Sequence, residues 1–134
     1  QTAMGWVATP ELVAASSNAG AFGFLALATC GPEEAIEMIE KTLTLTDQPF
    51  GINFHMFQPG ADQIVATVIK HRIKAVSYSR SPVAEYIQEF KKHGVMAMLR
   101  QLGAPHVFMT LSCAEVNYTV YISQNNWYVQ HKHS

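Results

Sequence analysis

The sequence predicts an α/β protein in which parallel strands alternate with helices. Short apolar runs alternate with amphipathic segments, and the unit recurs roughly every 25 residues. The apolar runs lack a polar alternate face, which is typical of strands buried on both sides. Helix start and stop signals stand between them. This order favours a parallel sheet with right-handed crossovers, and both a doubly wound sheet and a (β/α)8 barrel fit it.

The first unit begins with a helix that Thr9, Pro10 and Glu11 introduce. Thr9 can cap the helix, Pro10 suits its first turn, and Glu11 suits the positive end of its dipole. Gly20 ends it, and residues 22–27 form the strand that follows. We expect three side chains to face the core: Leu12, Ala15 and Ala19.

The second unit has a helix that begins at residues 31–34 and a strand over residues 49–54. Three apolar residues define its inner stripe: Ile36, Ile39 and Leu43. Glu37 and Lys41 are four residues apart on its outer face, and we expect them to form an ion pair.

Two further units follow the same order. Residues 59–62 open a third helix, and residues 75–78 form the next strand. Ser81 and Pro82 are expected to cap a fourth helix that ends at Gly94, before a strand over residues 95–99. The core-facing residues of these two helices are Ile64, Val65, Val68, Ile69, Tyr86, Ile87 and Phe90.

The pattern changes after Leu99. Residues 107–113 show no helical stripe, residues 116–122 alternate like a strand, and residues 123–134 are polar. We therefore divide the chain into an ordered array over residues 1–98 and a divergent tail over residues 99–134, with one helix or strand and a poorly ordered end. No linker separates the two parts.

Composition narrows the class of protein. The chain has 134 residues, 49% of them hydrophobic and 14% charged, with a formal net charge of −1. These values exclude a disordered tail, a coiled coil and a basic nucleic-acid binder. No apolar run reaches the roughly 18–20 residues of a membrane span. Two cysteines, Cys30 and Cys113, indicate a reducing compartment, and we expect a cytoplasmic protein.

Four motifs resemble one known family. They are MGWVATPELVAA (4–15) with NAG (18–20), TDQPFGINF (46–54), PGAD (59–62) and AVSYSRSP (75–82). Together they resemble the nitronate monooxygenase family, formerly called 2-nitropropane dioxygenase, which includes an FMN-dependent enoyl-acyl-carrier reductase branch. The family fold is a (β/α)8 barrel that holds FMN at the carboxyl ends of its strands. The resemblance therefore implies that residues 1–98 are an incomplete N-terminal half-barrel.

The resemblance also implies a function. Family members use FMN to oxidise alkyl nitronates with O2, or to reduce an enoyl thioester with NAD(P)H. A third hypothesis is a non-catalytic half-barrel that serves as a fragment or an interaction module. The family's histidine motif, which carries its base, has no match here, so no catalytic residue is assigned, and His106, His131 and His133 are not given that role. We expect no nucleic-acid or membrane partner, and we expect the half-barrel to self-associate through its open edges.

Four residues are the candidate FMN contacts. The resemblance implies that main-chain groups of Ala3, Met4 and Gly5 approach the flavin ring, and their small size permits it. Asn53, at a strand end, can offer a donor and an acceptor.

Several other polar residues can be explained without a role in FMN or substrate binding. His55 suits a solvated loop as well as a substrate contact, and Ser81 suits a helix cap. Ser79, Arg80 and Arg100 are further, less specific candidates near anions or the cofactor. No metal site is expected at His131 and His133, and both cysteines are interpreted as unreactive thiols.

The departure after Met98 suggests a change of reading frame. Residues 99–103 can be encoded by CTC CGA CAG TTG GGC. The same nucleotides read two bases later contain codons for Pro-Thr-Val-Gly, a sequence that members of this branch carry at this point. We hypothesise that the tail is an out-of-frame translation of a family gene or the product of a damaged copy. Sequencing of the coding DNA tests this.

Overall fold

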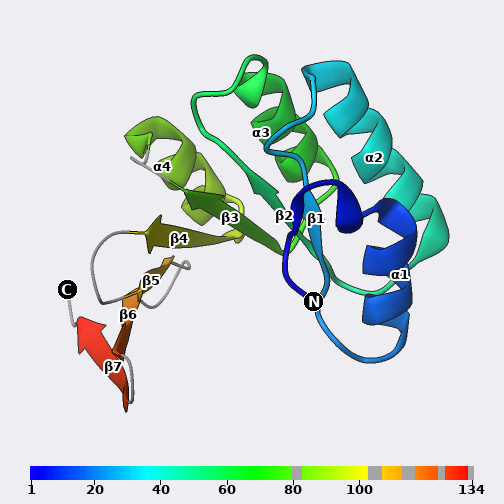
Figure 1. The fold of residues 1–134 in the computed structure, drawn as a ribbon. Helices are drawn as coiled ribbons and strands as arrows, with labels where there is room; N and C mark the ends of the chain where they lie inside the picture. The colour runs from blue at the N-terminus through cyan, green and yellow to red at the C-terminus, as the bar shows by residue number, and fades with distance from the viewer. Residues whose placement is uncertain (80–82, 103–106, 113–116, 124–125, 133–134) are drawn as a thin grey trace.

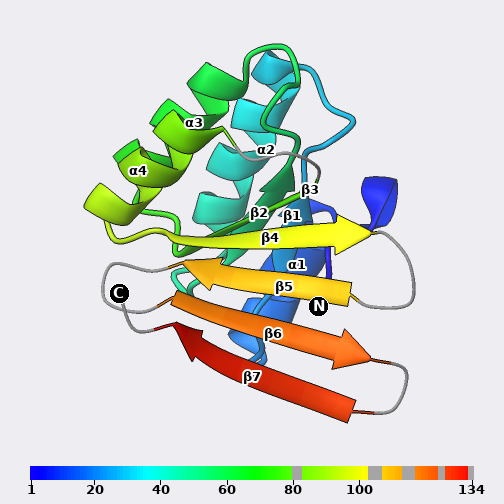
Figure 2. The ribbon, with the colours of Figure 1, turned by 90° about the vertical axis from the view of Figure 1, so that its left-hand side faces the viewer.

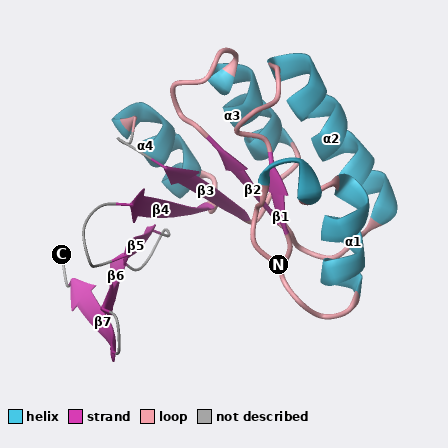
Figure 3. Cartoon of the chain, viewed as in Figure 1, coloured by secondary structure: helices cyan, strands magenta, loops and turns pink. Residues whose placement is uncertain are grey.

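A computed structural model describes residues 1–79, 83–102, 107–112, 117–123 and 126–132. Helices and strands alternate through the first three quarters of the chain, and strands alone follow (Figures 1 and 3). The helical elements are η1 (Gly5–Val7, a 3-10 turn), α1 (Pro10–Asn18), α2 (Pro32–Leu45), α3 (Ala61–Lys70) and α4 (Ala84–Lys92). The strands are β1 (Phe24–Ala26), β2 (Gly51–Phe54), β3 (Ala75–Ser79), β4 (Met96–Leu102), β5 (Val107–Ser112), β6 (Asn117–Ser123) and β7 (Asn126–Lys132).

The described strands form one seven-stranded sheet in the order β1 to β7. Strands β1 to β4 are parallel, as the alternating pattern predicts, and helices α1 to α4 lie along one side of them (Figure 1). Strands β4 to β7 pair antiparallel and lie side by side (Figure 2). The α/β prediction is confirmed for the parallel part.

The tail has three strands where we expected a single helix or strand. Consecutive strands there are joined by only a few residues, and such short connections can return the chain only in the antiparallel direction. The alternation over residues 116–122 predicted one of the three, β6. A domain boundary at residue 98, and poor order at the chain end, stay predictions.

The core lies between the parallel strands and the helices. Alternate strand residues, aligned by register, face this layer: Leu25, Ile52, Val76 and Ala97. The helices contribute buried side chains from their predicted stripes, including Ile39, Ile64 and Phe90. The rings of Phe54 and Phe90 meet edge to face at 6.4 Å. The opposite side of the strands carries a different set, which includes Asn53 and Ser77.

Three local predictions need correction. Helix α1 buries Val13, Ala14 and Ser17, whereas Leu12, Ala15 and Ala19 are exposed. Residues 12–15 are all apolar, so helical periodicity could not choose between the two faces, and the position of the helix on the sheet decides it. Helix α4 begins at Ala84 with Val83 at its N-cap position, and the caps expected at Ser81 and Pro82 lie outside the described residues.

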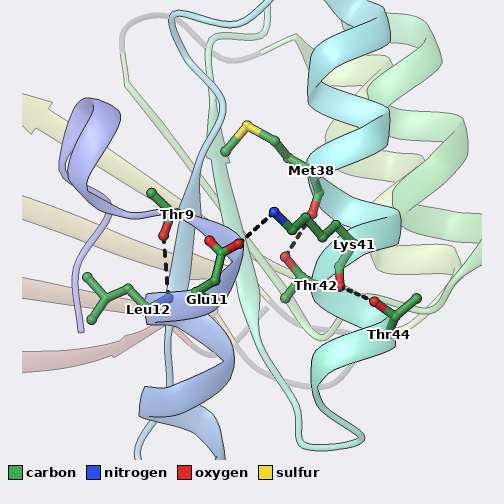
Figure 4. Close-up of polar contacts among 7 residues, drawn as sticks. All are labelled: Thr9, Glu11, Leu12, Met38, Lys41, Thr42 and Thr44. Carbon is green, nitrogen blue, oxygen red and sulfur yellow. Dashed lines mark hydrogen bonds and ion pairs between the residues drawn. The ribbon is translucent and has the colours of Figure 1, made fainter.

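The third correction concerns Lys41. Its Nζ lies 2.6 Å from Oε1 of Glu11 on α1 (Figure 4), and this contact, rather than one with Glu37, is its ion pair. This ion pair joins α1 to α2. It lowers the pKa of Glu11 from 4.5 to about 2, chiefly through the bond from Lys41. The predicted Thr9 cap is present, because Thr9 Oγ1 accepts the Leu12 N–H at 3.5 Å.

Candidate functional site at the carboxyl edge of the parallel strands

A row of residues crosses the parallel strands on the side away from the helices, close to the carboxyl ends of β1 and β2 and further from the ends of β3 and β4. Register places Ala26, Asn53, Ser77 and Met98 next to one another. Ala8 extends the row, since its carbonyl accepts the Ala26 N–H at 3.3 Å. In open or closed parallel sheets this edge is the usual position of a ligand site.

The side chain of Asn53 is held in one orientation by Ser77. Its Nδ2 donates to the main-chain carbonyl of Ser77 at 3.0 Å and lies 3.3 Å from the Ser77 hydroxyl. Among the described residues, no donor reaches Oδ1 of Asn53, and that atom is not sealed from solvent. The amide therefore presents an acceptor, while its donors are already used.

The second part of the site is the turn over residues 4–8. The Met4 carbonyl accepts the N–H groups of Val7 at 2.8 Å and Ala8 at 3.2 Å, which closes η1. Apart from its chain neighbours, no described residue has an atom within 4 Å of a Cβ added at Gly5, so the space beside this glycine is open. Met4 and Trp6 expose 54% and 86% of their surface. Two strand spacings, about 10 Å, separate Ala8 from Asn53 in the row.

Gln1 and Ala3 lie at the free edge of β1. The Gln1 ammonium group donates to the Phe22 carbonyl at 2.9 Å, and the Gln1 carbonyl accepts the Phe24 N–H at 3.1 Å. This is the bonding pattern of a parallel neighbour. Ala3 is half-buried between this pairing and the turn. The structure thus brings Ala3, Met4 and Gly5 to one end of the row that contains Asn53.

The loop after β2 is tied to the end of β1 by Gln58, a residue that the sequence analysis missed. Its Oε1 accepts the His55 N–H at 2.9 Å, and its Nε2 donates to the Leu27 carbonyl at 3.1 Å. Phe57 in this loop is 69% exposed. A glutamine in a loop carries no spacing signal, so only the folded contacts identify it.

The remaining candidates are one half-buried cysteine, three residues of which only the main chain is described, and five residues outside the described ranges. Cys30 is half-buried, and burial, followed by the charge of Glu34, raises the pKa of its thiol, which favours the unreactive form. The main chain of Ser79, Arg100 and His131 lies in β3, β4 and β7, and their side chains are not described. Five residues that the sequence analysis discussed lie outside the described residues: Arg80, Ser81, His106, Cys113 and His133.

The described part of the chain offers neither a cluster of metal ligands nor a helix that could cross a membrane. No three His, Cys, Asp or Glu side chains there come together as a metal site would require. None of the described helices has the length and apolar character that a membrane crossing needs.

The residues at this edge suit a flat aromatic cofactor with a polar rim. Asn53 offers one fixed acceptor, the turn offers main-chain groups over open space, and Met4 and Trp6 offer apolar surface. The isoalloxazine ring of FMN has an N–H donor flanked by carbonyls along one edge and an apolar dimethylbenzene at the other. The residues present therefore fit its ring.

Fold and site together define one part of an α/β barrel, with a ligand edge at the carboxyl ends of its strands. A family model described as nitronate monooxygenase matches residues 1–123. The chain belongs to the nitronate monooxygenase family, a family of oxidoreductases.

Curated relatives include two kinds of enzyme. The chain is 41% identical over 104 residues to the (3aS,4S,5R,7aS)-5-hydroxy-7a-methyl-1-oxo-octahydro-1H-indene-4-carboxyl-CoA dehydrogenase of Rhodococcus jostii, covering 78% of this chain and 29% of the relative. It is 40% identical over 60 residues to a nitronate monooxygenase of Pseudomonas aeruginosa, covering 45% of this chain and 17% of the relative. The chain thus spans less than a third of these relatives.

Solved structures agree on the fold. FabK from Thermotoga maritima matches with a TM-score of 0.67 and 30% identity, over 74% of this chain and 32% of that one. A nitroalkane oxidase from Streptomyces ansochromogenes matches with a TM-score of 0.65 and 23% identity, over 74% of this chain and 38% of that one. The prediction of an incomplete N-terminal half-barrel is confirmed.

Proposed function

We propose that this chain is the ring-contacting, N-terminal part of an FMN-dependent oxidoreductase that acts on an acyl thioester. The observation that carries the proposal is the fixed acceptor of Asn53, held by Ser77 in the same row of residues that the turn over residues 4–8 extends. When bound, FMN supplies a two-electron acceptor or donor for hydride. The residues of this chain bind the flavin ring and orient it toward the substrate.

Each residue has a limited role. Asn53 Oδ1 accepts a hydrogen bond from the ring N–H, and Ser77 keeps the amide from rotating. Main-chain groups of Ala3, Met4 and Gly5 would approach the ring, and Gly5 has no side chain to hold it away. Trp6 and Phe57 offer exposed aromatic surface near this edge, which suits an apolar acyl group. The general base of the reaction has no assigned residue in this chain.

The choice of a thioester rests on the longer match. A carboxyl-CoA dehydrogenase aligns over 104 residues of this chain, whereas the nitronate monooxygenases align over 60 and 59. Oxidation of an alkyl nitronate with O2, our expectation from sequence, is the second candidate, and the family model favours it. A cytoplasmic location stays a prediction.

Ring binding is tested with riboflavin, which has the ring without the phosphate. We expect weak, saturable quenching of its fluorescence by the chain, and at least tenfold weaker binding by Asn53→Leu. Asn53→Asp keeps an acceptor and should bind better than Asn53→Leu. Asn18→Ala is the control, because Asn18 bonds to the Leu45 carbonyl far from this edge. Equal binding by all four proteins would contradict the proposed contact.

The substrate class is tested separately. FMN-saturated protein is mixed under anaerobic conditions with a bicyclic acyl-CoA, with an enoyl thioester plus NADPH, or with propyl-2-nitronate. Bleaching of the flavin band by a thioester, or its recovery when the enoyl thioester is added after NADPH, supports the thioester proposal. Bleaching by the nitronate alone would replace it with the second candidate. The chain spans 29% of the thioester-acting relative, so we expect slow turnover.

A further inference from the structure

A cleft lies at the other end of the parallel strands, away from the candidate flavin edge. It is formed where the chain enters β2 and β3, and its volume is about 310 Å3. That is close to the volume of ten water molecules and reaches the lower limit for small-molecule sites. Phe50 and Ile73, both buried, line its apolar part. Leu43 and Pro49 line it as well, together with six polar residues: Thr46, Asp47, Gln48, His71, Arg72 and Lys74.

The polar lining carries an excess of positive charge. Arg72 and Lys74 are exposed, and within the described ranges neither makes an ion pair with a carboxylate. Asp47 is the single acid among the residues that line the cleft. His71 Nε2 is buried and has no hydrogen-bond partner among the described residues. A buried ring nitrogen without a partner is costly, so the fold gains nothing from this polar atom.

The backbone conformation of Arg72 also singles this residue out among those that line the cleft. Helix α3 ends with two bonds, from Arg72 N–H to the Ile69 carbonyl (3.2 Å) and from Ile73 N–H to the Val68 carbonyl (3.0 Å). This is the Schellman motif, and its left-handed position strongly prefers glycine. Arg72 occupies that position at φ +53°.

Helix α4 provides a comparison within the same chain. It ends with the same pair of bonds, from Gly94 to the Lys91 carbonyl and from Val95 to the Phe90 carbonyl, and Gly94 has φ +71°. The local sequences are also alike, Lys-His-Arg-Ile at α3 and Lys-His-Gly-Val at α4. The arginine at α3 is therefore strained where a glycine would not be, and its side chain stands on the rim of the cleft.

We propose that this cleft binds a small organic anion, with one carboxylate or phosphate group on a compact apolar body. Arg72 and Lys74 contact the anionic group, with Arg72 able to bind two of its oxygens at once. Phe50 and Ile73 contact the apolar body. The site is separate from the flavin edge, because it uses the amino ends of the strands.

The test uses phenyl phosphate and inorganic phosphate as probes of the full chain, followed by amide chemical shifts. Phenyl phosphate should give saturable shifts in residues 46–50 and 71–74. Arg72→Gly and Lys74→Gln should each weaken binding at least tenfold. Lys92→Gln, which removes a cation at the end of α4, should bind like the original chain. Inorganic phosphate should bind more weakly than phenyl phosphate, since it lacks the apolar body.

Folding of the variants is checked by their thermal unfolding. Arg72→Gly should unfold at a higher temperature than the original chain, so its loss of binding cannot be attributed to unfolding. The proposal is overturned if phenyl phosphate gives no saturable shifts at the cleft. It is also overturned if Arg72→Gly and Lys74→Gln bind like Lys92→Gln. Equal binding of the two probes would overturn the apolar part of the proposal.

Discussion

Gly60 should be far less replaceable than Gly94, although both have positive φ angles. Gly60 stands before α3 at φ +73°, and Gly94 follows α4 at φ +71°. An added Cβ at Gly60 would overlap Cβ of Pro32, at the start of α2, and lie 2.9 Å from its Cγ. At Gly94 an added Cβ would meet nothing within 4 Å. The two substitutions thus share the backbone strain and differ in the steric contact.

The magnitudes follow from these two terms. A left-handed backbone costs an alanine about 1–2 kcal/mol. Forcing an extra methyl group against a well-packed neighbour costs about 1–3 kcal/mol more, and a proline ring cannot rotate away. We expect Gly94→Ala to lower the free energy of unfolding by about 1–2 kcal/mol, and Gly60→Ala by roughly 2–5 kcal/mol.

Urea unfolding followed by circular dichroism measures both variants against the original chain. The difference between them isolates the contact between Gly60 and Pro32, because the backbone term cancels. Equal losses for Gly60→Ala and Gly94→Ala would refute the tight approach of the loop before α3 to the start of α2. That approach positions the loop that follows Asn53, so the result also bears on the candidate site.

Three further predictions concern the rest of the chain. Lys41→Met should raise the pKa of Glu11 from about 2 toward 4.5, as seen by carboxyl NMR titration. Because the pKa of Glu11 is lowered in the folded chain, the stabilisation from this exposed pair is present above pH 4.5 and disappears as the pH falls toward 2. Salt weakens it. A pKa of Glu11 that the substitution leaves unchanged would contradict the ion pair. Arg72→Gly should stabilise the chain by about 1 kcal/mol in urea, because glycine relieves the left-handed strain, and a loss of stability would mean that the arginine side chain supports the fold. Multi-angle light scattering should show self-association at micromolar concentrations, because no described strand pairs with the outer edge of β7; a monomer up to millimolar concentration would refute it.

The local sequence predicted most of the parallel array. The apolar run in β2, the Thr9 cap and the stripe of α3 are local patterns, and each reappears in the structure. Asn53 could be placed at a strand end because strand and loop signals are adjacent there. Its orientation could not be predicted, since it depends on Ser77, which lies 24 residues away in sequence.

Other features depend on contacts between elements. Lys41 had a carboxylate four residues away, yet it pairs with Glu11 on a neighbouring helix, where the folded chain brings the two charges within 2.6 Å. The four apolar residues at positions 12–15 gave α1 no unique inner face. The cleft at the amino ends of β2 and β3 has one feature that is visible in the sequence: Arg72 follows α3 at the position where Gly94 follows α4.

The central claim is that the flavin ring lies at the carboxyl edge of the parallel strands, between the turn over residues 4–8 and Asn53. Amide chemical-shift mapping during titration of the chain with FMN tests it most directly. We predict the largest shifts in residues 4–8, 26–27, 53–55 and 77–79, and their loss in Asn53→Leu. Shifts confined to residues 46–50 and 71–74, or no saturable shifts with millimolar FMN, would contradict the claim.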